Sequence, residues 1–352
     1  MLVGINYPWI DYGWDFGGPP AEWVASGNPA AWREKKRNLI EEDFGRFAAR
    51  GIFAVRWFLL ADGLNYGMGE CAPQRAAHGW TFDPLPAGDP FYGRLLDDFE
   101  FVLRVCARNN IKLLPSLVDF PWCRQGMPVA GSPGIVKGGR YDIVRDPAKR
   151  RAFFDRVLDP LLALSMKYRD SIHAWELVNE PEWVVRNFWR WWMNDTNRAV
   201  SRREMGEFIA DGSRRINARQ LPGGGSVFQS SVGFAHWDTL NAWNAEALGI
   251  TLPQFHYYAQ KNRELPAFSG IAGHSCIVGE FATAAGKDWP ELKARSSGQT
   301  VTNRLRCIEN KGYPACFLWS ARAADPATRW TEKEHREIAT YTGAAPSGDT
   351  LV

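Results

Sequence analysis

Two glutamates that each end an apolar run are the residues of this sequence best placed to do chemistry. Glu180 lies in "HAWELVNEPEW", after the apolar residues 172–178, and Glu280 lies in "IVGEFAT". Cleavage of a glycosidic bond needs two carboxyl groups: one protonated, to assist the leaving oxygen, and one ionised, to attack or to activate water. A single glutamate at a strand end is more often a cap or an ion-pair partner, so this chemistry requires that the two lie together.

The run before Glu180 is one of eight strand-like segments in the chain. They are residues 2–6, 52–58, 111–118, 173–178, 227–232, 251–257, 276–280 and 315–319. Several are apolar without alternation, which is typical of parallel strands that are buried on both faces. Helical patterns separate most of them, at residues 35–50, 91–109, 147–168, 202–218, from 238 onward, 302–310 and 331–341.

Strands that alternate with helices form βαβ units, and eight such units predict a closed (β/α)8 TIM barrel. We therefore expect an α/β fold with one catalytic barrel over residues 1–341, long aromatic-rich βα loops and a flexible tail at 342–352. An open doubly wound sheet is the alternative. That fold usually carries a glycine-rich phosphate turn after its first strand, and the sequence has no G-x-G-x-x-G there.

Composition argues against several classes of protein. The 352 residues include 42 basic and 39 acidic ones, and a net charge of +3 gives no basis for binding nucleic acid or an anionic membrane. No apolar run reaches the roughly 18 residues of a membrane span. No basic region followed by an apolar stretch opens the chain, so we expect no signal peptide and a cytoplasmic protein, or a secreted one if a signal has been removed.

The six cysteines show no zinc-binding spacing, and we expect neither a metal nor a cofactor. Most are expected to be buried thiols, while Cys71 and Cys123 lie in predicted loops and could pair. The chain also has 17 tryptophans, many of them in polar, loop-like stretches. A single such residue usually packs beneath its loop, but as a group they predict a surface that stacks on a flat ligand. Examples are Trp9, Trp14, Trp122, Trp183 and Trp237.

In a (β/α)8 barrel the active site lies at the C-terminal ends of the strands. Glu180 and Glu280 end the fourth and seventh expected strands, which face each other across part of the barrel mouth. The other expected strand ends are also polar or aromatic: Asn6, Tyr7, Arg56, Trp57, Asp119, Asn179, Ser231, His256, Tyr258, Trp319 and Ser320. The connections at the opposite rim are ordinary short turns, so the pattern marks one rim as the site.

The chain resembles the clan A glycoside hydrolases, and among them the cellulase-like family 5. The resemblance rests on "AVRWFLL", "WELVNEPEW", "QFHYY", "IVGEFAT" and "CFLWS", which follow barrel order over about residues 2–340. It implies a retaining β-glycosidase, an O-glycosyl hydrolase that cleaves β-linked oligo- or polysaccharide through a covalent glycosyl-enzyme intermediate. The two carboxyl groups would then lie roughly 5–5.5 Å apart.

Carried over residue by residue, the resemblance makes Glu180 the acid/base and Glu280 the nucleophile. Asn179 would hydrogen-bond the sugar 2-hydroxyl, and Arg56 would keep the pKa of Glu280 low. Arg56 could instead pair with a buried acid.

Three further positions follow from the same resemblance. His256 and Tyr258, two apart on one strand, would point into the mouth, where His256 lines the site and Tyr258 hydrogen-bonds Glu280. Trp319 would form the floor beneath the cleaved sugar. His256 and Trp319 could instead belong to the core.

The chain departs from the family pattern at the end of the third strand, where a histidine is common. This sequence has Asp119 there, with Trp122 nearby; Asp119 could grip a sugar hydroxyl or cap the loop. The tryptophans of "WRWWMND" could wall off one side of the cleft, favouring exo action, or pack beneath it. Two other functions stay open: a transglycosylase that uses the same intermediate, and a catalytically silent glycan-binding barrel.

Overall fold

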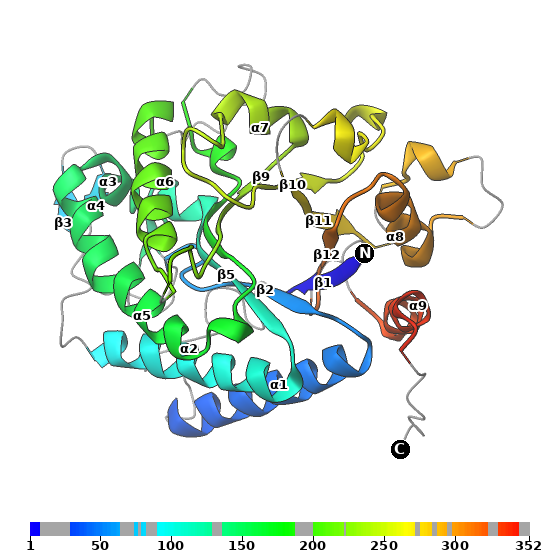
Figure 1. Cartoon of the computed structure of the whole chain (residues 1–352). Coiled ribbons are helices and arrows are strands. Elements are labelled where there is room, and N and C mark those ends of the chain that lie inside the picture. Colours follow the sequence, from blue (N-terminus) through cyan, green and yellow to red (C-terminus); the bar gives the residue numbers. More distant parts are fainter. Residues whose placement is uncertain are drawn as a thin grey trace.

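The computed structural model describes residues 1–7, 29–63, 74–76, 79–81, 90–128, 136–186, 200–221, 223–271, 275–283, 287–293, 298–322 and 330–344. These residues form a closed barrel of parallel strands with helices around it (Figure 1). Its eight strands are β1 (Leu2–Asn6), β2 (Ala54–Phe58), β5 (Lys112–Asp119), β8 (Trp175–Asn179), β9 (Ser230–Phe234), β10 (Gln254–Tyr257), β11 (Ile277–Ala282) and β12 (Ala315–Trp319). They pair in chain order, and β12 returns to β1. The predicted (β/α)8 barrel is confirmed.

The outer layer is helical. It consists of α1 (Pro29–Ala49), α2 (Pro90–Asn109), α3 (Tyr141–Arg145), α4 (Pro147–Phe153), α5 (Asp159–Lys167), α6 (Arg202–Asn217), α7 (Trp237–Trp243), α8 (Val301–Asn310) and α9 (Glu332–Thr342). Ser201 and Thr331 start α6 and α9 with capping boxes, which satisfy backbone N–H groups of the first turn. Within the described ranges, no helix has the length and apolar character needed to cross a membrane.

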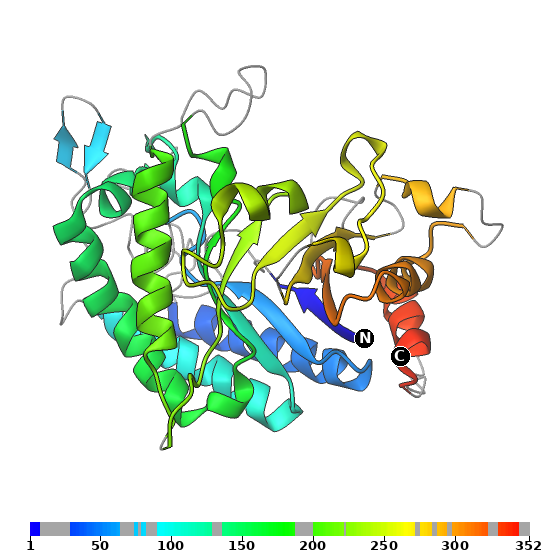
Figure 2. The same cartoon turned by 45° about the horizontal axis from the view of Figure 1, so that its top comes forward.

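Two small hairpins lie outside the barrel. One joins β3 (Gln74–Ala76) to β4 (Gly79–Thr81) and lies at the periphery of the molecule (Figure 2). The other joins β6 (Met127–Pro128) to β7 (Val136–Lys137), in the connection that follows β5.

Three expectations about local structure need correction. The helix expected at 147–168 is interrupted by a π-helical turn, Phe154–Leu158, just before Pro160, which has no N–H to donate to a helix. The fifth strand begins and ends later than 227–232, so Ser231 lies inside the barrel and not at its mouth. Trp237 is not a loop residue but starts α7, where it packs near Phe255 and Tyr257.

Other expectations fall outside the described residues. These are the ones placed on Trp9, Trp14, Trp189, Trp191, Trp192, Cys71 and residues 345–352. Cys123 is a buried free thiol, as are Cys106, Cys276 and Cys316.

Side chains alternate along each barrel strand between the interior and the helical layer. An apolar floor fills the interior: Ala54, Leu114, Ala174, Leu252, Ile277, Ala315 and Phe317. A polar residue follows four of these floor residues at a distance of two positions, toward the mouth. These polar residues are Arg56, Ser116, Glu176 and Gln254, and all are buried. The strand period of two therefore stacks a polar layer on the apolar floor, directly below the mouth.

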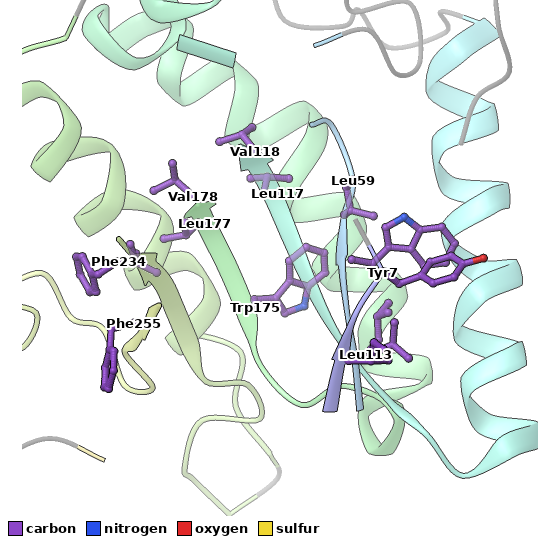
Figure 3. Close-up of a cluster of buried hydrophobic side chains, with 14 of the residues drawn as sticks. Tyr7, Leu59, Leu113, Leu117, Val118, Trp175, Leu177, Val178, Phe234 and Phe255 are labelled. Carbon is purple, nitrogen blue, oxygen red and sulfur yellow. The ribbon is translucent and has the colours of Figure 1, made fainter. Parts of the chain in front are cut away.

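The opposite faces of the strands pack against the helices and form the main hydrophobic core. Figure 3 shows part of it, including Leu113 and Leu117 of β5 and Leu177 of β8. Trp175 packs against Phe99 of α2, with ring centroids 5.5 Å apart. Burying each large apolar side chain contributes about 1.5–3 kcal/mol, so this layer holds the ring of strands in place.

The last part of the chain closes the barrel against the first. Asp43 of α1 accepts a hydrogen bond of 2.5 Å from the Tyr7 hydroxyl and forms an ion pair with Arg322, which follows β12. Nearby, the rings of Phe47 and Trp330 stack with centroids 5.4 Å apart. The contacts of Asp43 with Arg322 and of Phe47 with Trp330 join residues about 280 positions apart. Because Asp43 also binds Tyr7, they hold the end of β1 beside β12.

Gly4→Ala tests the packing inside the barrel. A Cβ at Gly4 would lie 2.4 Å from Cε1 of Phe317 and 3.0 Å from the carbonyl oxygen of Ala54. Overpacking of this kind costs about 1–3 kcal/mol, so the variant should unfold at a lower denaturant concentration than the wild type. Gly45→Ala is the matched control because an added Cβ in α1 meets nothing within 4 Å. Equal midpoints for the two variants would contradict the packing described.

Candidate active site

Arg56 is the centre of the polar network at the barrel mouth. Its guanidinium is fully buried and contacts two carboxylates: Nε and Nη2 donate to Glu176 at 2.5 and 2.7 Å, and Nη1 donates to Glu280 at 2.7 Å. It also donates to the side-chain oxygens of Asn6 and Asn179, each at 2.7 Å. Burial alone lowers the pKa of Arg56, but the two carboxylates outweigh it and raise that pKa above its usual value. Arg56 thus fulfils both roles considered for it, pairing with a buried acid and contacting Glu280.

Glu176 is the buried acid, and sequence reasoning missed it. Ser116 donates to its Oε1 at 2.8 Å and Gln254 to its Oε2 at 2.6 Å, so every contact comes from the interior polar layer. Gln254 also reaches Ser231 at 3.0 Å. The sequence does contain a signal, because Glu176 is a charged residue within an otherwise apolar strand. A buried charge must be paired, so such a residue indicates a cationic partner nearby. Asn6, whose Nδ2 donates to backbone oxygens of β11 and β12, was noted only as a strand end.

Glu280 is the partner of Arg56 that lies at the barrel mouth. Its Oε1 accepts from Arg56, and its Oε2 accepts from the Tyr258 hydroxyl at 2.7 Å, which is the contact expected for Tyr258. Burial raises the pKa of Glu280, and His256, Arg56 and Tyr258 oppose that rise. Arg56 lowers the pKa of Glu280, as expected of an opposite charge, but withdrawal of the carboxylate from water is the larger effect and the net shift is upward.

Glu180 has an unusual backbone conformation. Strand β8 ends at Asn179, and Glu180 follows with φ 44° and ψ 53°, in the left-handed region. For a residue other than glycine this costs about 1–2 kcal/mol. The conformation is held on both sides, by a bond of 2.6 Å from the Glu180 N–H to the Gly233 carbonyl and by the turn η6 (Pro181–Trp183). Strain of this kind persists where the surroundings over-determine it, typically at functional sites.

The Glu180 carboxyl is held by neutral partners. His256 Nδ1 lies 2.7 Å from Oε1, and the Trp183 indole N–H donates to Oε2 at 2.8 Å. Burial raises the pKa of Glu180 to about 7, against opposing effects of the Trp183 hydrogen bond and of Arg56. Since Arg56 hydrogen-bonds Glu280 and not Glu180, the ionised form is favoured at Glu280 and the protonated form at Glu180.

His256 lies between the two glutamates. Its Nε2 is 3.4 Å from Oε1 of Glu280 and has no hydrogen-bond partner within the described part of the chain. Burial lowers the pKa of His256 to about 4, so the imidazole is neutral at neutral pH. One carboxylate oxygen of each glutamate and a ring nitrogen of His256 all lie within 4.8 Å of one another. Retaining pairs are about 5–5.5 Å apart, whereas inverting pairs are about 6.5–9.5 Å apart.

The same three side chains are a group that could hold a metal ion. The guanidinium of Arg56 lies 2.7 Å from the Glu280 oxygen, and its positive charge opposes a cation there. The donor set therefore fits proton transfer better than metal binding.

Asn179 and Asp119 end neighbouring strands. Nδ2 of Asn179 donates to Asp119 at 2.9 Å while its Oδ1 accepts from Arg56, so the amide orientation is fixed and one N–H is left for another acceptor. Asp119 also caps the turn η3 (Phe120–Cys123) by accepting from the Phe120 N–H at 2.8 Å. Burial raises the pKa of Asp119 well above its usual range.

The two remaining predicted contact residues differ in location. Trp319 ends β12 partly exposed, with its ring edge-on to Phe58 at 6.1 Å between centroids. Trp122 is fully buried and packs against Phe153 at 5.2 Å, so it does not reach the mouth and is corrected to a core residue. Phe153 belongs to α4, so the Trp122 ring faces the helical layer.

Comparison with known proteins gives the fold. No protein-family model matches the sequence, and no curated protein does. Among solved structures, the chain is similar to a β-mannanase from the blue mussel Mytilus edulis, with a TM-score of 0.65 and 16% identity over 100% of this chain and 94% of that one. It is also similar to an endo-1,4-β-mannanase from Eisenia fetida, with a TM-score of 0.66 and 18% identity over 98% and 91% of the two chains. A third similar structure is a β-1,4-D-mannanase from Cryptopygus antarcticus, with a TM-score of 0.64 and 15% identity over 97% of this chain and 90% of that one.

Glu176→Gln tests how far the site depends on its buried ion pair. Removing one charge leaves Arg56 short of an anionic partner in the interior, and breaking a buried pair costs about 3–5 kcal/mol. The expected result is a large fall in the free energy of unfolding, measured by denaturant titration. Glu207→Gln is the control because Glu207 is 37% exposed and pairs with Arg203 and Arg150, a surface arrangement worth about 1 kcal/mol or less. A similar small loss in both variants would refute the central place of Arg56.

Proposed function

We propose that the chain is a retaining β-glycoside hydrolase of clan A, closest in type to family 5. The observation that carries the proposal is the geometry of Glu180 and Glu280. One carboxylate oxygen of each lies within 4.8 Å of the other, and Arg56 hydrogen-bonds Glu280 and not Glu180. That arrangement supplies a protonated acid beside an ionised carboxylate, which cleavage with retention requires.

The reaction would proceed in two steps. A Glu280 oxygen attacks the anomeric carbon, the bond to the leaving oxygen breaks, and the Glu180 proton moves to that oxygen. Glu180, now ionised, takes a proton from water as the water oxygen attacks the anomeric carbon and releases Glu280.

Surrounding residues position this reaction. Arg56 and Tyr258 hold both oxygens of Glu280, so the attacking carboxylate has one orientation. The free N–H of Asn179 is available to the sugar 2-hydroxyl, a contact that strengthens in the transition state. Trp319, partly exposed at the end of β12, would pack against the sugar ring.

The proposed substrate is a β-linked oligo- or polysaccharide. The similar solved structures are named as β-mannanases, so β-1,4-linked mannose is the first linkage to test.

Glu280→Ala and Glu180→Ala test the pair directly. A panel of aryl β-glycosides and β-linked oligosaccharides should be cleaved by the wild type, and each variant should lose at least about a thousandfold in kcat, since each removes a group that reacts. Azide should rescue Glu280→Ala to an α-glycosyl azide and Glu180→Ala to a β-glycosyl azide, with NMR identifying the products. Full activity in Glu280→Ala would overturn the nucleophile assignment.

The pH dependence of kcat/KM should be bell-shaped. Activity needs Glu180 protonated, so the alkaline limb should lie near the Glu180 pKa of about 7. The acidic limb reports ionisation of Glu280. Tyr258→Phe removes a hydroxyl that lowers the Glu280 pKa, so that pKa rises and the acidic limb moves to higher pH while the alkaline limb stays. An unchanged acidic limb would show that Tyr258 does not act on the ionising group.

A further inference from the structure

We propose that Glu182, two residues after the candidate acid, is a positioning residue that holds Glu180 in place for proton transfer. The proposal rests on the function proposed above and deepens it. It gives a role in the reaction to the second glutamate of the segment "NEPE", which is fully buried and acts through Glu180 without touching the substrate.

Glu182 replaces a contact that the barrel sheet loses at its mouth. Glu180 donates its N–H to the Gly233 carbonyl, so in a continued parallel ladder the Ala235 N–H would donate to the Glu180 carbonyl. The left-handed turn at Glu180 directs that carbonyl to the Trp183 N–H instead. Oε2 of Glu182 accepts from the Ala235 N–H at 3.3 Å and supplies the lost acceptor. The strained residue is thus tied to β9 through its own N–H and through the carboxyl of the next residue but one.

The other oxygen of Glu182 reaches the helical layer. Oε1 accepts from the indole N–H of Trp243, the last residue of α7, at 3.2 Å. Both side chains are buried, so removal of either partner leaves a polar group without a hydrogen bond in the interior. The turn that carries Glu180 is therefore held by a strand and a helix at once.

The peptide that Glu182 binds is also connected to the candidate nucleophile. The Ala235 carbonyl accepts from the Gln260 amide at 3.4 Å, and Oε1 of Gln260 accepts from the Tyr258 N–H at 3.2 Å. The Tyr258 hydroxyl in turn hydrogen-bonds Glu280. A chain of hydrogen bonds thus joins the turn of the acid to the residue that holds the nucleophile, and Glu182 is its link to the acid.

The described partners of Glu182 are neutral donors. Burial raises the pKa of Glu182 to about 7, against the hydrogen bonds of Thr239 and Ala235, and ionised Glu180 raises it further. Other charged or titratable side chains on the surrounding elements are Asp119, Arg124, Arg202, His236, Asp238 and Arg263. Below its pKa Glu182 adds no charge beside Glu180, so its contribution is one of position.

The experiment separates a displaced acid from a less stable fold. Proton transfer assists cleavage of a phenyl β-glycoside strongly, but it does little for the dinitrophenyl β-glycoside of the same sugar, whose anion leaves unaided. The sugar is the one that the wild type cleaves in the aryl glycoside panel. In Glu182→Ala the ratio of kcat/KM, phenyl over dinitrophenyl, should fall at least about tenfold, because a displaced acid loses part of its contribution. A smaller folded fraction alone would lower both values equally.

The pH profile gives an independent readout. Burial is the largest cause of the raised pKa of Glu180, and the fully buried Glu182 side chain fills the space behind its turn. Glu182→Ala should admit water there, so the Glu180 pKa should fall toward its ordinary value. The alkaline limb of kcat/KM on the phenyl glycoside should then move to lower pH.

Two milder variants test the same contacts if Glu182→Ala does not fold. Trp243→Phe keeps a ring but removes the donor to Oε1, so the ratio should fall about threefold. Glu182→Gln keeps the length of the side chain and one acceptor oxygen, so its ratio should lie between those of Glu182→Ala and the wild type.

Glu334→Ala is the matched control. Glu334 is likewise a buried glutamate that accepts a backbone N–H, that of Thr331 at 2.9 Å, but it lies at the start of α9. Its loss should lower stability and leave the ratio and the alkaline limb unchanged. If the wild type is active and the ratio or the limb is unchanged in the Glu182 variants, the role of Glu182 is overturned and the proposed function stands. If the wild type cleaves no glycoside, the proposed function is overturned, and this role with it.

Discussion

A single buried cation, Arg56, organises the mouth of this barrel. A guanidinium removed from water is unfavourable unless anions and acceptors surround it, and Glu176, Glu280, Asn6 and Asn179 do so. These partners come from three other strands, so satisfying one charge fixes β1, β8 and β11 against β2. The geometry of the candidate site therefore follows from the need to neutralise the Arg56 charge beneath the mouth.

The two glutamates at the mouth acquire different properties from the same burial. Withdrawal from water raises the pKa of both carboxyls, yet only Glu280 contacts the cation. Glu180 is instead held by an indole N–H and a neutral imidazole, at the end of a strand that turns into the left-handed region. The position of Arg56 thus gives two identical side chains different tendencies to ionise, and this difference is what the proposed function requires of an acid and a nucleophile.

Several polar groups serve two purposes at once. Asp119 caps a turn and also fixes the amide of Asn179, and Trp183 ends the turn η6 and also hydrogen-bonds Glu180. Because such groups couple the geometry of the loops to that of Asn179 and Glu180, the turns η3 and η6 act as parts of the candidate site. The apolar floor beneath, from Ala54 to Phe317, supplies the rigid base on which this polar layer rests.

The sequence alone determined the barrel, its eight strands to within about three residues, and the meeting of Glu180, Glu280, Arg56, His256 and Tyr258. Those features follow from local periodicity: strands alternate with helices, and a period of two brings alternate side chains to one mouth. Only the tertiary structure decided the offset of β9, the burial of Trp122, the ion pair of Glu176 and the raised pKa of Glu280. Each of these depends on which distant side chain lies opposite and on how much water is excluded, and neither is recorded in the spacing of residues along the chain.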